Sequence, residues 1–88
     1  MDMTETTLAG LSPGARAEVT RLTTAGALRR RLLDIGLTPG TAAEALYRSR
    51  NGGIAAYRIR GAVFALRRED AGTVLVRISG DGGEAAWA

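Results

Sequence analysis

Glycine-containing turns divide this chain into segments that are too short for long helices. Twelve of the 88 residues are glycine. The turn signals are Ser12-Pro13-Gly14, Thr38-Pro39-Gly40, Asn51-Gly52-Gly53, Gly61 and Gly72. Most segments between them alternate apolar and polar residues, and a period of two is typical of half-buried β-strands. The sequence therefore predicts a mainly β fold, built as a single domain because chains of this length rarely hold two cores.

Five short strands are expected. Their ranges are 15–22, 41–48, 54–60, 62–67 and 73–78. The alternation in the second strand places Tyr47 on the same side as Ala43 and Ala45, while Gly61 predicts a bulge or a tight bend between the third and fourth strands. Five strands in so small a domain are best arranged as a closed or nearly closed barrel, because closure removes exposed edges.

One short amphipathic helix is expected after the first strand, starting near Ala25. Thr23 or Thr24 can cap it, because a threonine oxygen accepts from the free amides of the first helical turn. Apolar residues then recur at helical spacing, and this stripe is predicted to plug the open end of the barrel. The stripe consists of Leu28, Leu32 and Ile35.

The helix meets a strong stop signal. Gly36 stands where a left-handed cap is needed, and Leu37 can fold back onto the helix as the hydrophobic partner of that cap. Thr38-Pro39-Gly40 matches a type II turn, with proline presetting the first central dihedral angle and glycine taking the positive one. Residues 68–72 predict a single helical turn before the last strand. We expect the ordered domain over 11–78, with a flexible leader, 1–10, and a flexible tail, 79–88.

The charged residues are unusual because every basic side chain is arginine. The body, residues 11–78, holds all twelve arginines and five of the nine acidic residues, which gives it a net charge of +7. The positive electrostatic potential of such a domain attracts nucleic acid, anionic lipid or an acidic protein surface. The chain has no cysteine and no histidine, so thiolate and imidazole metal sites cannot form, and serine or threonine nucleophiles have no adjacent histidine base.

Four blocks of the sequence resemble one known family, the FeoA domains that act as cytoplasmic partners of the ferrous iron permease FeoB. The blocks are Leu11-Ser12-Pro13-Gly14, the run from Arg29 to Thr41 (RRRLLDIGLTPGT), Arg58-Ile59-Arg60-Gly61 and the run from Ala65 to Ala71 (ALRREDA). Family members commonly carry A-P-x-G-D-P at the hairpin, whereas this chain has SRNGGI at 49–54. The two glycines still supply the geometry of the turn.

The resemblance implies an SH3-like barrel without enzymatic activity or a bound cofactor, which binds a FeoB-type permease at its cytoplasmic side and modulates it. The protein is then expected in the cytoplasm, and no segment indicates a signal peptide or a membrane span. Position and chemistry make Arg31, Leu33 and Leu37 the candidate partner-binding residues, with both leucines in a partly exposed apolar patch. Self-association through that patch stays open as an alternative.

Other functions fit the residues less well. A small basic barrel that binds nucleic acid is the main alternative, but Tyr47, Tyr57 and Phe64 are the only aromatic residues of the body, and stacking platforms need several exposed rings. A groove for proline-rich peptides lacks aromatic residues for the same reason. The module is also similar to the carboxy-terminal domain of metal-dependent repressors, but these 88 residues offer no segment for a helix-turn-helix, so a stand-alone repressor is not expected. Direct iron binding would need carboxylates alone, and most of these are expected to form surface ion pairs with arginine.

Overall fold

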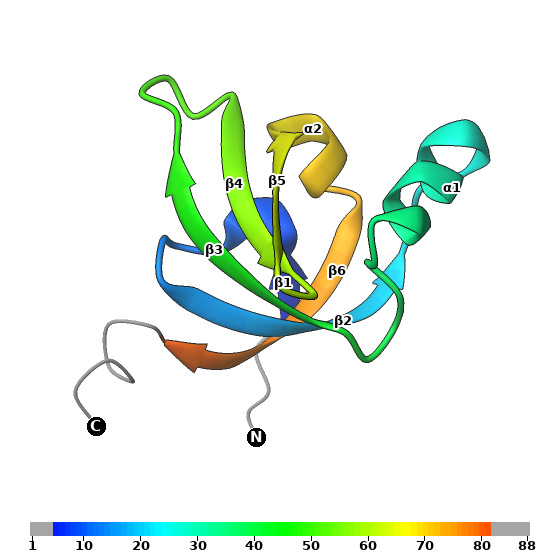
Figure 1. The fold of residues 1–88 in the computed structure, drawn as a ribbon, viewed down its shortest axis with the longest axis horizontal. Coiled ribbons are helices and arrows are strands. Elements are labelled where there is room, and N and C mark those ends of the chain that lie inside the picture. Colours follow the sequence, from blue (N-terminus) through cyan, green and yellow to red (C-terminus); the bar gives the residue numbers. More distant parts are fainter. Residues whose placement is uncertain (1–4, 82–88) are drawn as a thin grey trace.

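The computed structural model describes residues 5–81, which form one curved antiparallel sheet with short helices around it (Figure 1). The elements in chain order are β1 (Glu5–Thr7), the 3-10 helix η1 (Leu8–Gly10), β2 (Ala15–Leu22), α1 (Gly26–Asp34), β3 (Ala42–Arg48), β4 (Ile54–Ile59), β5 (Ala62–Arg67), α2 (Arg68–Ala71) and β6 (Val74–Asp81). The strand order across the sheet is β1-β6-β2-β3-β4-β5. The mainly β fold, the helix after the first long strand and the helical turn before the last strand are confirmed.

The sheet differs from the expected five-stranded barrel in two respects. A sixth strand, β1, pairs with β6, so that Glu5 lies opposite Arg77 and Thr7 opposite Leu75. In the part of the chain that the structure describes, β1 and β5 are the two edges of the sheet and do not pair with each other. The barrel is therefore open between these edges, although the sheet curves around a single core.

The prediction of a flexible leader over 1–10 is wrong for its second half. Leu8 is 0% exposed and belongs to the core. The Tyr57 hydroxyl donates a hydrogen bond to the Leu8 carbonyl at 3.2 Å. A single leucine among threonines gives no periodicity, so the sequence offered no sign that this segment closes the core. Residues 1–4 lie outside the described part, and of the predicted tail, 79–81 continue β6 while 82–88 lie outside it.

The predicted bend at Gly61 is a tight β-hairpin turn. Ile59 pairs with Ala62, so only Arg60 and Gly61 lie between β4 and β5. Both have positive φ, 53° and 84°, as a two-residue type I′ turn requires. The hairpin predicted with its tip at Asn51-Gly52-Gly53 is also confirmed, because the Ser49 amide donates to the Ile54 carbonyl at 2.7 Å.

The amino end of α1 is built differently from the prediction. Its N-cap residue is Ala25, and no side chain caps the helix. The two threonines instead tie the end of β2 to the start of β6: the Thr23 hydroxyl donates to the Thr73 carbonyl at 3.1 Å, and the Thr24 and Thr73 hydroxyls hydrogen-bond to each other. These tertiary partners remove both threonines from the capping position, so the free amides of the first turn have no side-chain acceptor.

The carboxy end of α1 is built as predicted. Gly36 has φ of 111°. Its amide donates to the Leu33 carbonyl at 3.0 Å, and the Leu37 amide donates to the Leu32 carbonyl at 3.1 Å. This pair of hydrogen bonds is the Schellman motif. The type II turn follows at once, with the Thr41 amide donating to the Thr38 carbonyl at 3.0 Å.

One strand face differs from the simple alternation. The pairing of β3 with β4 shifts register between Ala45 and Tyr47, so a bulge interrupts the period of two. Tyr47 therefore turns away from Ala43 and Ala45, which are buried, and is 64% exposed. The prediction that groups Tyr47 with these alanines is wrong for this reason.

Candidate functional site

The α1 surface is the shallow depression of about 280 Å³ that the exposed side of helix α1 forms. It is lined by Gly26, Arg29, Arg30, Leu33 and Asp34. Leu33 is half-buried and the residues around it are exposed. An apolar side chain thus lies among arginines and one carboxylate, an arrangement suited to a partner surface that combines apolar and acidic groups.

Helix α1 stands to one side of the sheet, beyond the end of β2 (Figure 1). Of its residues, only Leu32 is buried. Leu28, Leu33 and Ile35 pack partly against the core, which agrees with the prediction that the stripe plugs one end of the barrel. Few apolar groups thus hold the helix, and no side chain caps its amino end.

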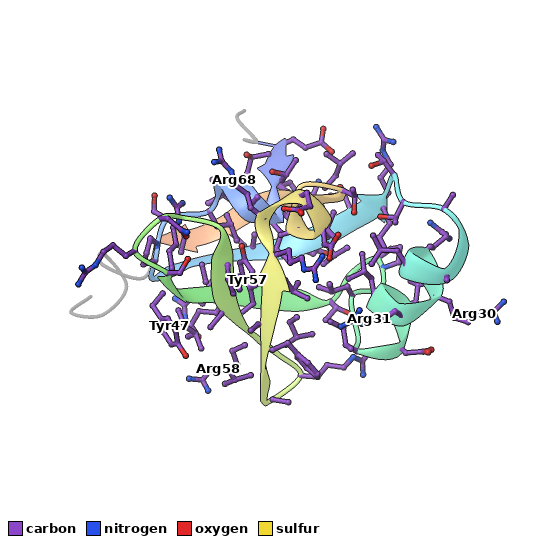
Figure 2. All side chains as sticks on the ribbon, turned by 90° about the horizontal axis from the view of Figure 1, so that it is seen from above. Arg30, Arg31, Tyr47, Tyr57, Arg58 and Arg68 are labelled. Carbon is purple, nitrogen blue, oxygen red and sulfur yellow. The ribbon has the colours of Figure 1, made fainter. Side chains whose placement is uncertain are left out.

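The three consecutive arginines of α1 have different surroundings. The Arg29 Nη1 lies 3.5 Å from the Leu22 carbonyl oxygen, a long hydrogen bond to the end of β2. Figure 2 shows Arg30 pointing away from the molecule, whereas Arg31 lies on the side of the helix nearer the sheet. Arg31 is exposed, so its guanidinium and the half-buried Leu33 are both accessible to a partner.

The prediction of a partly exposed Leu37 is wrong. Leu37 is 0% exposed, because the Schellman motif folds it back beneath the helix. It contributes to the core and offers no surface for contact. Of the three candidate partner-binding residues, Arg31 and Leu33 therefore remain.

A second, smaller cavity lies at the base of the β3–β4 hairpin. It has a volume of about 110 Å³, and its lining includes Arg48, Tyr57 and Arg68. The Arg48 Nη2 donates to the Leu11 carbonyl at 2.7 Å. Burial raises the pKa of the Tyr57 phenol above its ordinary value of 10.0, and the nearby Arg48 guanidinium opposes part of that shift. The hydrogen bond to Leu8 and the burial make Tyr57 a structural residue.

The stability of the protein should fall steeply in alkaline solution because of Tyr57. Its pKa is raised on folding, so the folded state binds the phenolic proton more tightly and stability is lost as the pH rises past 10, by up to about 1.4 kcal/mol per pH unit. No histidine, cysteine or lysine contributes a second transition. Urea unfolding at about pH 8 and at about pH 11, below and above the ordinary pKa of a phenol, measures the effect.

The Tyr57→Phe variant should lose this alkaline dependence. It should also lose about 1 kcal/mol of stability at neutral pH, because the hydrogen bond to Leu8 is removed. Tyr47→Phe, the same change on an exposed ring, is the control. An alkaline transition that survives in Tyr57→Phe would contradict this origin.

The carboxylates of the described residues form no cluster suited to a metal. No group of three or more His, Cys, Asp or Glu side chains lies together within residues 5–81. Two carboxylates instead form exposed ion pairs: Glu44 Oε1 lies 3.6 Å from Arg58 Nε, and Glu18 Oε1 lies 3.6 Å from an Arg77 guanidinium nitrogen. Exposed pairs of this kind contribute little to stability.

A family model describes most of the chain. The model of the FeoA domain matches residues 6–78. The chain belongs to the FeoA domain family. The matched residues include part of β1 and all of η1, which agrees with an ordered amino-terminal segment and not with a flexible leader. No curated protein sequence matches the chain.

Solved FeoA structures share the fold. The FeoA protein from Chlorobium tepidum is 35% identical with a TM-score of 0.77, and the match covers 82% of this chain and 69% of that one. A crystal structure of an iron uptake regulatory protein (FeoA) is 28% identical with a TM-score of 0.76, and the match covers 86% of this chain and 99% of that one. Stenotrophomonas maltophilia FeoA, an SH3 domain protein solved in complex with zinc, is 27% identical with a TM-score of 0.71. The match covers 80% of this chain and 87% of that one.

A manganese-dependent transcriptional repressor shares the fold at 21% identity, with a TM-score of 0.78, over 85% of this chain and 41% of the repressor. The SH3-like fold implied by the sequence is thus confirmed. Membership of the FeoA family supports a role for this chain in ferrous iron transport. No helix within residues 5–81 has both the length and the apolar character to cross a membrane.

Proposed function

We propose that this FeoA domain is a non-enzymatic accessory protein that binds a FeoB-type ferrous iron permease at its cytoplasmic side and modulates transport. The domain then acts in the cytoplasm and needs no cofactor. The α1 surface is the observation that carries the proposal. It presents the half-buried Leu33 among Arg29, Arg30 and Asp34, and the exposed Arg31 lies on the side of the helix nearer the sheet.

The α1 surface fits a partner patch in which apolar groups are surrounded by carboxylates. Burying Leu33 would supply apolar contact area, while the arginines would steer the two proteins together and fix their orientation. Helix α1 is held to the sheet by few contacts, so binding energy can shift its position relative to the barrel. Modulation of the permease would follow from such a shift or from assembly alone, with GTP hydrolysis performed by the partner.

The proposal is tested by titrating the isotope-labelled protein with the cytoplasmic GTPase domain of the FeoB-type permease from the same genome. Saturable NMR shifts should cluster on residues 26–37. The double variant Arg31→Glu/Leu33→Asp should bind at least about tenfold more weakly, a loss of about 1.4 kcal/mol. Arg50→Glu, at the tip of the β3–β4 hairpin and away from α1 (Figure 1), is the matched charge reversal.

Two results would overturn the proposal. One is wild-type affinity of the double variant for the GTPase domain. The other is saturable binding of a duplex oligonucleotide, falling with added salt, without any binding of the GTPase domain, because that outcome assigns the cationic surface to nucleic acid.

A further inference from the structure

The outer face of strands β3, β4 and β5 carries an exposed apolar patch that lies apart from the α1 surface. Tyr47, Ile54 and Val63 are 64%, 49% and 52% exposed. Register places them on one side of the sheet, since Tyr47 lies opposite Ala56, Ala56 opposite Ala65, and Val63 opposite Arg58. Figure 2 shows Tyr47 and Arg58 projecting on the same side of the sheet, away from Tyr57. Sequence reasoning missed this patch because the bulge in β3 reverses Tyr47.

The patch borders a free strand edge. β5 is the last strand of the sheet, so one side of its backbone has no strand partner among the described residues. In a two-residue hairpin the residues that flank the turn form a hydrogen-bonded pair, here Ile59 and Ala62. Along an antiparallel ladder, hydrogen-bonded pairs alternate with pairs that share no hydrogen bond. Phe64 and Leu66 therefore also bond to β4. The amides and carbonyls of Val63 and Ala65 point away from β4, toward the side of β5 that has no neighbouring strand among the described residues.

The charges around this edge favour one kind of occupant. Arg67 lies on the outer face with the patch, opposite Ile54, and Arg60 stands in the turn at one end of β5. Arg58, opposite Val63 on the same face, is ion-paired with Glu44. A second copy pairing antiparallel about Phe64 would bring the Arg60 end of one edge against the Arg67 end of the other. That arrangement sets like charges opposite each other, which is destabilising. A strand with acidic side chains has no such conflict.

We propose that the edge of β5 and the outer face beside it bind an extended, acidic segment of a partner protein as an added β-strand. The backbone of the segment pairs with Val63 and Ala65. Apolar side chains on the outer face of the added strand cover Val63, and its carboxylates lie against Arg67. Main-chain hydrogen bonds supply affinity in this mode, and alternate side chains supply specificity. The surface is separate from α1, so the domain can hold two partner segments at once.

The test uses two synthetic peptides with blocked ends, in which threonine occupies every second position. The positions between, which share one face of a strand, alternate valine with glutamate in the acidic peptide and valine with lysine in the basic one. The acidic peptide should give saturable NMR shifts on residues 62–67 and at Ile54, and it should bind at least tenfold more tightly than the basic one. Hydrogen exchange adds a specific signature: the Val63 and Ala65 amides should exchange fast in the free protein and become protected with the acidic peptide, whereas the Phe64 amide should be protected in both.

Two variants separate backbone pairing from charge. Val63→Pro removes an outward amide and no bond to β4, so the fold should be kept while affinity for the acidic peptide falls at least tenfold. Arg67→Glu, an exposed substitution, should reduce the preference for the acidic peptide. The inference is overturned by equal binding of the two peptides, by shifts confined to other surfaces, or by protection of Val63 that rises with protein concentration alone, which would assign the edge to a second copy.

Discussion

Replacing Gly36 with alanine is expected to destabilise the domain by about 2–5 kcal/mol, the sum of backbone strain and overpacking. Gly36 has φ of 111°, which L side chains rarely adopt. A Cβ atom there would lie 2.8 Å from Arg60 Cδ and 3.2 Å from Ile59 Cγ2. The exposed Arg60 side chain can swing aside, but Ile59 is fully buried, so the core must shift to make room for the Cβ. Urea unfolding followed by circular dichroism measures the loss.

Gly52→Ala is the matched control for this prediction. Gly52 also has a positive φ, 78°, but nothing lies within 4 Å of the added Cβ. Only the cost of the left-handed conformation then applies, about 1–2 kcal/mol. Equal destabilisation by the two substitutions would mean that the contact between the α1 cap and the β4–β5 turn contributes nothing.

Leu37→Ala should cost about 2–5 kcal/mol, as do other changes that leave a cavity in a packed core. Leu37 is fully buried, and its amide bonds to Leu32 in the cap of α1. The substitution therefore removes core packing at the point where the helix joins the sheet. Thermal unfolding should show the loss as a lower Tm, and the NMR signals of α1 should broaden or shift most.

Leu33→Ala is the comparison, because the same chemical change is made on a half-buried side chain. It should cost less than half as much stability and weaken binding to the GTPase domain instead. A larger loss of stability for Leu33→Ala than for Leu37→Ala would contradict the roles given to the two leucines. The pair thus separates a structural leucine from a binding leucine only four positions away.

The features that the sequence predicted best depend on local backbone geometry. Gly36, Gly40 and Gly61 have the positive φ that their turns require, and the α1 cap forms the predicted hydrogen bonds. Such features follow from chirality and from a few neighbouring residues. They fixed the order of helix, turns and the five longer strands before any tertiary contact was known.

The errors arose where a distant segment decides the local structure. Residues 5–7 form the strand β1 because they pair with the distant strand β6. Thr23 and Thr24 leave the helix cap because Thr73 offers them partners. Tyr47 changes face because β3 shifts its register against β4. The same limit applies to the candidate site: Leu33 and Leu37 have similar sequence surroundings, and only the packing of the cap shows which one is accessible.

The position of β6 constrains when the domain can fold during synthesis. β6 lies between β1 and β2 in the sheet, and it supplies the buried Val74 and Val76. The first strands of the chain therefore cannot complete their pairing until the last strand has been synthesised. Nearly the whole domain must leave the ribosome before the core can close. Pairings this distant in sequence make folding slow compared with a helical protein of equal length. Until β6 emerges, the nascent chain exposes an unfinished sheet, the state in which small β proteins are most prone to aggregate or to require a chaperone.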